Sequence, residues 1–502
     1  MFSSTCPSCG APVSFLSSAS TTAVCAFCKS TLSRDAGTLA LIGKQGELLE
    51  DYSRLQIGTT GKVVHGNQLH AFSLIGRIQL RFDSGYWNEW YLLFDNGQTA
   101  WLSDASGQYV LLQELQLNEA IPSYDSVAVG QPINIANKPF TVTDKRTSEC
   151  IGGQGELPFA ASSTWQARTV DCRSASDFIS LDFSDDKAVA YLGKTIAFEG
   201  LSLGHLRDTK DRFTGEAVAG QLAKTTVKSL NCSSCSAPIK LVLGQTNHLI
   251  CPSCGSALRE QNDSLILEIE RKNIARAATA LQPGDTGEID GTQWIILGVL
   301  VRHEKTDPGS SWEEYLLFES LKGFAWLSNV QGAWQMIDVL NEQPILAGDK
   351  ASVGNLTYNR TFEYIAITSY AAGSFNWKPE VGNAVKVTEY KSGQRSLSSE
   401  QTDTELTWSR GKPVAANVIL RAFGKISKDT NQTTQKAGSL LVPTLVASLV
   451  MVVAIGPAYF MPSLASNPLG GIFAMLVLWG PYIFSKIDTS KLKNDSDTDA
   501  GD

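Results

Sequence analysis

Eight of the ten cysteines form two sets of closely spaced thiols. Each set reads Cys-x2-Cys-x15-Cys-x2-Cys, and the second repeats the first at an offset of 226 residues. A tetrahedral metal ion needs four ligands at about 2.3 Å, which two CxxC turns joined by a hairpin can supply. We therefore predict two zinc ions per chain, one in each zinc ribbon. The predicted ligands are Cys6, Cys9, Cys25, Cys28, Cys232, Cys235, Cys251 and Cys254.

Both predicted metal sites are closed. Four cysteines leave no open position for a substrate or water, so a structural ion is expected rather than a catalytic one. Iron is the chemical alternative, because tetrahedral sites of four sulfurs suit both metals. Buried free thiols or redox dithiols are a further alternative. The strict recurrence of the spacing favours metal.

The charge of the ribbons argues against nucleic-acid binding. Residues 6–28 contain no Asp, Glu, Lys or Arg, and residues 232–254 contain one charged residue, Lys240. Phosphate recognition depends on Lys and Arg. The whole chain carries a net charge of −8, whereas nucleic-acid binders usually have a basic face. A structural or protein-docking role fits these ribbons better.

The remaining thiols and the histidines do not follow the repeat. Cys150 and Cys172 have no counterparts in the second copy, which favours two unrelated thiols over a redox pair. His248 precedes Cys251 by three residues, but four cysteines already fill that site. We therefore expect His248 at the surface.

The elements that position these thiols belong to a tandem duplication with a mainly β fold. Strand-like runs alternate with turns, as in Tyr91–Phe94 followed by Asp95-Asn96-Gly97, a strong hairpin signal. Segments with helical periodicity are scarce. The predicted order is zinc ribbon 1–35, β-rich domain 36–205, linker 206–230, zinc ribbon 231–262, β-rich domain 263–424, polar linker 425–436, transmembrane hairpin 437–485 and disordered tail 486–502.

A family resemblance rests on a repeated aromatic motif. The run from Trp87 to Phe94, followed by Ala100-Trp101-Leu102-Ser103 and a glycine turn, occurs in both copies. It resembles the bacterial domain-of-unknown-function family 4178 over most of 36–205 and 263–424. The resemblance implies a bacterial protein whose gene neighbours include membrane proteins and polyamine-synthase-like enzymes. It assigns no activity.

Two glutamates are candidates for ligand or partner binding. Glu89 and Glu313 match at an offset of 224, each two residues before a shared tyrosine, Tyr91 or Tyr315. They could form a binding carboxylate in an aromatic patch. The alternative is a solvent-facing position on a strand with a period of two. The repeated Trp101 and Trp326 are expected in the core.

An uncharged stretch of 49 residues, 437–485, lies between Lys436 and Lys486. One membrane span needs about 20 apolar residues, so the stretch predicts two spans, near 438–461 and 468–485. Lys and Arg flank the hairpin but are absent from its turn, which places both ends in the cytoplasm. Reduced metal-bound cysteines and the lack of a secretory signal agree with this orientation.

These features predict a membrane-anchored scaffold or adaptor on the cytoplasmic side of the bacterial inner membrane, with a protein partner. No P-loop, dinucleotide fingerprint, nucleophile elbow or HExxH motif occurs, so an enzyme is not favoured. The alternative is a subunit or accessory of a membrane-associated enzyme, such as one related to polyamines. Nucleic-acid binding ranks third.

Overall fold

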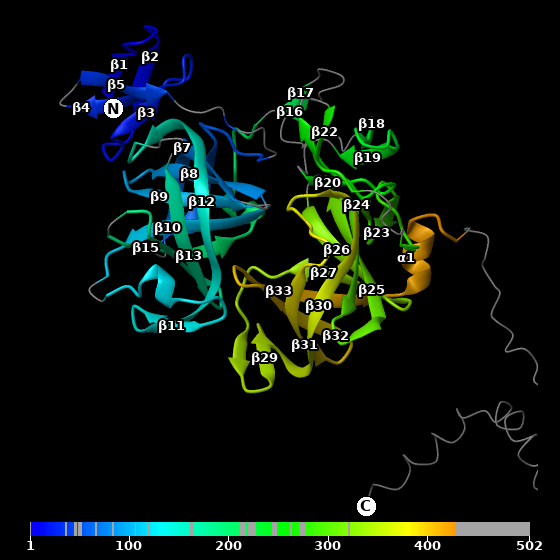
Figure 1. Cartoon of the computed structure of the whole chain (residues 1–502). Helices are drawn as coiled ribbons and strands as arrows, with labels where there is room; N and C mark the ends of the chain where they lie inside the picture. Colours follow the sequence, from blue (N-terminus) through cyan, green and yellow to red (C-terminus); the bar gives the residue numbers. More distant parts are fainter. Residues whose placement is uncertain are drawn as a thin grey trace, which may run out of the picture. The chain divides into compact units, whose positions relative to one another are not determined.

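The computed structural model describes most of the chain before the uncharged stretch (Figure 1). It covers residues 2–426, except for 36–37, 45–47, 49–52, 66–67, 83–84, 106, 118–119, 161–164, 186, 208, 211–216, 219–226, 243–247, 262–263, 272–276 and 320–321. The ribbons and β-rich domains lie within one compact unit, Met1–Lys425. The predicted mainly β fold is confirmed, because strands dominate and a single α-helix, α1 (Ala416–Ala422), occurs among the described residues.

The first β-rich domain is a closed antiparallel barrel, called barrel 1 here. Its strands follow the order β7-β8-β9-β10-β15-β14-β13-β12, and β12 pairs with β7 to close the ring. Closure leaves the barrel wall without a free edge. The strands are β7 (Gln68–Phe82), β8 (Gly85–Phe94), β9 (Thr99–Ala105), β10 (Gln108–Leu115), β12 (Lys138–Leu157), β13 (Gln166–Ser174), β14 (Asp177–Asp182) and β15 (Val189–Ile196).

The second β-rich domain, barrel 2, repeats this topology. Its order is β24-β25-β26-β27-β33-β32-β31-β30, closed by the pairing of β30 with β24. The identical order confirms the duplication predicted from the sequence. The strands are β24 (Thr292–Glu304), β25 (Asp307–Glu319), β26 (Gly323–Val330), β27 (Ala333–Val339), β30 (Leu356–Phe375), β31 (Ala384–Ser392), β32 (Arg395–Gln401) and β33 (Leu406–Val414).

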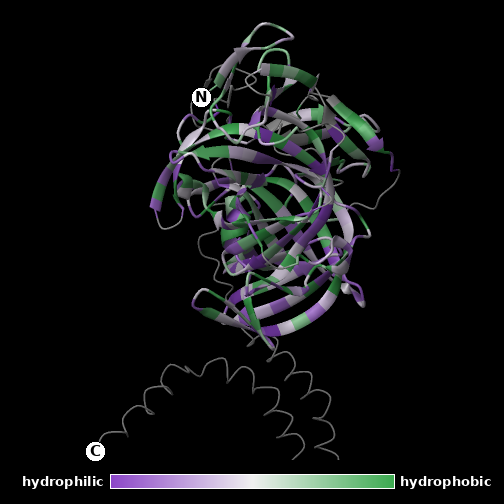
Figure 2. Cartoon of the chain, turned by 90° about the vertical axis from the view of Figure 1, so that its left-hand side faces the viewer, coloured by the Kyte–Doolittle hydropathy of each residue, from purple (hydrophilic) through white to green (hydrophobic). Residues whose placement is uncertain are grey.

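Alternating side chains build a core on each face of the barrel wall. Hydrophobic and hydrophilic residues alternate along many barrel strands in Figure 2, as expected for strands with two different faces. In barrel 1, the outer face of β7–β10 carries a cluster around Trp90 and Leu102, both fully buried. Tyr315 and Leu327 take these places in barrel 2. The predicted Asp95-Asn96-Gly97 turn joins β8 to β9, with Gly97 at φ +85°.

Each ribbon combines a hairpin with a small sheet that joins its barrel. In ribbon 1, β3 pairs with β12 at Val24 and Gly155; in ribbon 2, β20 pairs with β30 at Ile250 and Gly373. The ribbons are therefore hydrogen-bonded extensions of the barrel walls. Their strands are β1 (Phe2–Thr5), β2 (Pro12–Phe15), β3 (Thr22–Val24), β4 (Ser30–Asp35), β5 (Thr38–Lys44), β18 (Val227–Asn231), β19 (Pro238–Val242), β20 (His248–Ile250), β21 (Ala257–Gln261) and β22 (Ser264–Ile269).

A buried carboxylate adds a second link between ribbon 1 and barrel 1. Glu156 of β12 is 5% exposed and accepts hydrogen bonds from the backbone N–H groups of Leu16 and Ser17, at 2.6 and 3.1 Å. These charge-assisted bonds fix the turn between the two halves of the ribbon against the barrel.

Short elements complete the described part of the chain. Hairpin strands β6 and β23 precede the barrels and pair with β7 and β24. Strands β16, β17 and the start of β18 lie within the predicted linker 206–230. The bounds are β6 (Thr60–His65), β11 (Pro132–Ile135), β16 (Thr209–Lys210), β17 (Ala217–Val218), β23 (Thr286–Ile289), β28 (Ile345–Ala347), β29 (Lys350–Val353), η1 (Tyr124–Ser126) and η2 (Phe198–Leu201).

The predicted membrane hairpin falls outside the described residues. Among the residues that are described, no helix is long and apolar enough to cross a membrane. The hairpin at 437–485, the tail 486–502 and the linker beyond residue 426 belong to the part of the chain that the structure does not describe.

Candidate metal centres and the barrel interiors

The four cysteines of ribbon 1 converge on one point. The Sγ atoms of Cys6 and Cys28 lie 3.7 Å apart, and so do those of Cys9 and Cys25. All four sulfurs lie within 4.8 Å of one another. A tetrahedron with metal–sulfur bonds of about 2.3 Å has edges of about 3.8 Å, so the spacing fits one metal ion.

Ribbon 2 repeats this geometry with the predicted cysteines. Cys232 and Cys254 are separated by 3.8 Å between sulfurs, and Cys235 and Cys251 by 3.7 Å. In both ribbons the first and third cysteines are buried and the second is exposed. The sequence-predicted ligands are thus brought together in two matching sets, and the metal bound there would hold the ribbon halves together.

Tight backbone turns position each pair of thiols. The N–H of Gly10 donates to the carbonyl of Cys6, and that of Gly255 donates to Cys251, both at 2.8 Å. The residue after the second cysteine of each pair has a left-handed backbone, which glycine adopts without strain. These residues are Gly10, Lys29, Ser236 and Gly255, with φ between +60° and +75°.

A serine lies beside the last cysteine of each ribbon. The hydroxyl of Ser30 is 3.1 Å from Cys28 Sγ, and that of Ser256 is 3.3 Å from Cys254 Sγ. The Ser30 hydroxyl and backbone N–H lower the pKa of Cys28 to about 6. Burial opposes ionisation of Cys254, yet Ser256 lowers its pKa to about 6 as well. Both serines favour the thiolate form that binds metal.

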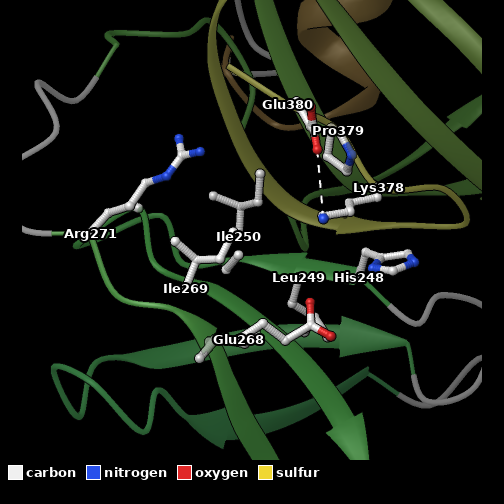
Figure 3. Close-up of a pocket in the computed structure, with 12 residues that line it drawn as sticks. His248, Leu249, Ile250, Glu268, Ile269, Arg271, Lys378, Pro379 and Glu380 are labelled. Carbon is white, nitrogen blue, oxygen red and sulfur yellow. Dashed lines mark ion pairs between the residues drawn. The ribbon is translucent and has the colours of Figure 1, made fainter. Parts of the chain in front are cut away.

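His248 occupies the junction between ribbon 2 and barrel 2 instead of the expected surface position (Figure 3). It is half-buried, and its Nδ1 has no hydrogen-bond partner among the described residues. Burial lowers the pKa of its imidazole. The adjoining cavity, beside the Lys378–Glu380 ion pair at 3.6 Å, has a volume of about 30 Å³. That space holds a water molecule but no organic ligand.

The interior of barrel 2 contains an ion-pair network. Arg302 of β24, 4% exposed, donates to Glu314 of β25 at 3.2 Å and to Glu400 of β32 at 2.7 Å. Strands β24 and β32 are not neighbours in the wall, so this contact crosses the interior. The indole N–H of Trp312 also donates to Glu314, at 2.7 Å, and Tyr364 donates to Glu389.

Barrel 1 carries carboxylates at the matching positions. Glu89 of β8 accepts a hydrogen bond from the Trp87 indole at 2.7 Å, as Glu314 does from Trp312. Asp171 lies opposite Ser180, as Glu389 lies opposite Ser398. Asp182 on β14 corresponds in the same register to Glu400 on β32. Both interiors therefore share three carboxylates on equivalent strands.

The structure corrects the predicted equivalence of Glu89 and Glu313. Glu89 matches Glu314, because Tyr91 pairs with Trp101 and Leu316 pairs with Trp326. Tyr91 therefore corresponds to Leu316 rather than to Tyr315. The equivalence of Trp101 and Trp326 is confirmed, and both indoles are partly buried and pack against hydrophobic clusters of their barrels, as expected.

Glu313 lies on the outer side of the wall, away from the interior network. Its Oε2 accepts from the hydroxyl of Tyr315 at 2.5 Å and from Asn329 at 2.8 Å, and its Oε1 accepts from the Ala280 N–H at 3.2 Å. Three donors thus engage this carboxylate. It borders an open groove of about 400 Å³. The groove is lined chiefly by Val301, Ser311, Trp312, Glu313, Asn329 and Gln331.

Cys150 and Cys172 lie in different hydrophobic clusters of barrel 1 and are fully buried. Burial raises the pKa of the Cys150 thiol to about 11 and also raises that of Cys172. Two inert core thiols match the interpretation favoured by the sequence.

Several functional residues escaped the sequence analysis. Ser30 and Ser256 recur at the same offset of 226 as the cysteines, so extending the motif to Cys-x2-Cys-x-Ser would have found them. The interior acids recur at a different offset, 218 for both Asp171–Glu389 and Asp182–Glu400. No local motif marks them.

A family comparison identifies the two barrels. The profile of the domain of unknown function DUF4178 matches residues 61–198 and 282–416, together more than half of the chain. The chain belongs to the DUF4178 family. The match confirms the predicted resemblance and its two tandem copies, and each DUF4178 copy coincides with one barrel. No curated protein and no solved structure matches the chain.

Proposed function

We propose that this DUF4178 protein is a zinc-dependent scaffold or adaptor that is anchored to the bacterial inner membrane and displays two barrels to a protein partner in the cytoplasm. The observation that carries the proposal is the continuity of each ribbon with its barrel. In both copies a strand that follows the first thiol pair extends the barrel wall, at Val24–Gly155 and Ile250–Gly373.

Zinc is the proposed ion in both ribbons. Four thiolates at tetrahedral spacing suit zinc, and they leave no position for a reacting water. The ion would stabilise small ribbon cores that include its own ligands, such as Cys6 and Cys25 in ribbon 1. A structural ion of this kind supports a binding surface and performs no reaction.

The surroundings of the candidate glutamates favour binding over catalysis. A general base must reach the proton that it removes. The Glu313 carboxylate instead accepts from Tyr315, Asn329 and Ala280. The adjoining groove is open and suits contact with a partner surface better than enclosure of a substrate.

Membrane anchoring is proposed from the uncharged residues 437–485 and their flanking lysines. The described residues contain the metal-binding sites and both barrels. The hairpin would then tether the two DUF4178 copies close to a membrane-bound partner.

Affinity purification from detergent-solubilised membranes tests the proposal. The full chain should sediment with membranes, contain two zinc ions and retain one reproducible partner, which a Cys25→Ser, Cys251→Ser double variant should lose. The matched control is Cys150→Ser, which removes a core thiol outside the metal sites. A chain without zinc, or a partner retained equally by the double variant, would contradict the zinc-dependent adaptor.

A further inference from the structure

The interiors of the two barrels share three acids but differ in the positive charge beside the acid of β8 and β25. Leu80 lies opposite Trp87 in barrel 1, whereas Arg302 lies opposite Trp312 in barrel 2. The matched strands therefore place an apolar side chain where the second copy has a guanidinium. This exchange leaves Glu89, the counterpart of Glu314, without the cation that pairs with Glu314.

The described contacts of Glu89 are those of an acid without a counter-ion. Its hydrogen bonds come from the Trp87 indole and the Ser103 hydroxyl, both neutral. The charges that act on it are those of the carboxylates Asp171 and Asp104, and both raise its pKa. Burial raises the pKa of Asp171 as well, but Arg146 and Arg173 act in the opposite direction and favour its ionised form.

Electrostatics decides which acid is neutral. A carboxylate enclosed by a barrel wall loses hydration, and only a nearby cation or strong donors can replace it. Two acids that face each other do not both ionise readily. Since Asp171 has two arginines and Glu89 has none, the proton belongs on Glu89.

We propose that barrel 1 holds a proton on Glu89 in the role that the Arg302 guanidinium plays in barrel 2, and that loss of this proton loosens barrel 1. The same fold thus neutralises its interior in two ways. The Glu314 carboxylate of barrel 2 has a permanent ion pair with Arg302, whereas the Glu89 carboxyl of barrel 1 is neutralised by a proton and responds to pH.

The direction of the pH response follows from the two states of Glu89. Burial raises its pKa from an ordinary value near 4.5 to about 8 in the folded chain. The folded state thus binds one proton more than the unfolded state between these values, and stability falls as pH rises from about 4.5 to 8. The other charged or titratable groups near it are Asp104 on β9, Glu114 on β10, Asp144 and Arg146 on β12, Asp171 and Arg173 on β13, Asp182 on β14 and Tyr191 on β15.

Two matched variants of the full chain, measured in detergent, separate the barrels. Glu89→Gln imitates the neutral acid and keeps an acceptor for Trp87, whereas Glu314→Gln removes one partner of Arg302. Hydrogen exchange, read by mass spectrometry on peptides from β8 and β25 between pH 5 and pH 8, reports each barrel separately. Rates are compared with the wild type at the same pH, which cancels the intrinsic pH dependence of exchange.

We expect Glu89→Gln to protect β8 at least as well as the wild type at pH 5. The ratio of the wild-type exchange rate to that of Glu89→Gln should then grow by up to about tenfold for each pH unit, because one proton is involved. Glu314→Gln should speed exchange in β25 at every pH in the range. An Asp171→Asn variant should keep the pH dependence of β8.

Three results would overturn the proposal. The first is a Glu89→Gln chain that fails to fold or exchanges faster than the wild type at pH 7, since this would show that the ionised form is required. The second is a ratio of β8 exchange rates between wild type and Glu89→Gln that does not change with pH. The third is a pH dependence that disappears in Asp171→Asn but persists in Glu89→Gln.

Discussion

At the scale of single residues, the candidate metal sites include groups beyond the four cysteines. Ser30 is 5% exposed and lies against Cys28, the half-buried ligand of ribbon 1. A hydroxyl that donates to a thiolate spreads part of its negative charge and fixes its orientation. The equivalent Ser256 is fully buried and also contacts the backbone of Arg271 at 3.1 Å, which ties ribbon 2 to the following segment.

Replacing Ser30 with alanine should weaken metal binding in ribbon 1 by about tenfold or more, the usual effect of losing such an outer contact. Competition with a chromophoric chelator would measure the affinity. Ser8→Ala is the matched control, because Ser8 is exposed in the same ribbon between two ligands. Equal metal affinities for Ser30→Ala and Ser8→Ala would show that the Ser30 hydroxyl does not contribute to metal binding.

The metal ligands were predictable because their spacing is local, but the partners of the glutamates were not. The shared Tyr-Leu-Leu-Phe run suggested that the two copies align at an offset of 224 residues. The strand pairings instead make Trp87 equivalent to Trp312, which is an offset of 225 residues. Successive side chains point to opposite faces of a strand, so a slip of one residue moves a side chain across the wall. This slip explains why Glu313, on the outer side, was matched to the interior Glu89.

At the scale of elements, the connection between ribbon and barrel depends on glycine. Gly155 has φ +68°, and a Cβ placed on it would lie 2.2 Å from the carbonyl oxygen of Ile75. Gly373 repeats this in barrel 2, with φ +102° and Leu297 O at 2.3 Å. Each glycine lies where β12 or β30 pairs with both the ribbon and the closing strand. Any side chain would force these strands apart.

Gly155→Ala should therefore destabilise barrel 1 by several kcal/mol, combining an unfavourable left-handed backbone of about 1–2 kcal/mol with a backbone clash. Gly97→Ala separates the two effects, because Gly97 has φ +85° and open space around its Cα. Gly97→Ala should lose only the stability that corresponds to the unfavourable left-handed backbone. Urea unfolding of both variants would test this, and similar losses would argue against the clash.

Barrel closure itself was not visible in the sequence. The hairpins β8–β9 and β9–β10 were predictable, because a turn and two flanking strands lie within a few residues. The closing pair of Cys150 with Leu80 joins residues seventy positions apart. No local signal specifies that pairing, so the sequence supported a β-rich domain but not a barrel.

At the scale of the whole molecule, the ribbons have hydrophobic clusters of their own, although Ile250 of β20 belongs to a cluster of barrel 2. The ribbon clusters include the candidate metal ligands, such as Cys232 and Cys251 in ribbon 2. The barrel clusters contain none of these cysteines; one cluster of barrel 2 includes Tyr315 and Leu317. Loss of metal should therefore affect the two kinds of domain unequally.

Chelation should unfold both ribbons and leave the barrels folded, because zinc contributes about 10–16 kcal/mol to the folding of small metal domains. Hydrogen exchange should rise across residues 2–35 and 231–261, while β8 and β25 stay protected. Restoring zinc should reverse the change. Loss of protection throughout the chain would mean that the barrels need the ribbons for stability.

The last prediction concerns the uncharged residues 437–485. A helix that spans a membrane satisfies its own backbone hydrogen bonds, so the proposed hairpin requires no support from the barrels. A chain that ends at Lys436 should be released from membranes while keeping both zinc ions, as fractionation and elemental analysis would reveal.

Three lysines, Lys486, Lys491 and Lys493, follow the stretch, whereas its central turn at 462–468 has none. Positive residues stay on the cytoplasmic side. A reporter fused after Asp502 should therefore be active in the cytoplasm, and one inserted at 463–467 should behave as exported. Export of the C-terminal reporter would mean a single crossing, because the second span, with Gly470, Gly471 and Pro481, would then not cross the membrane.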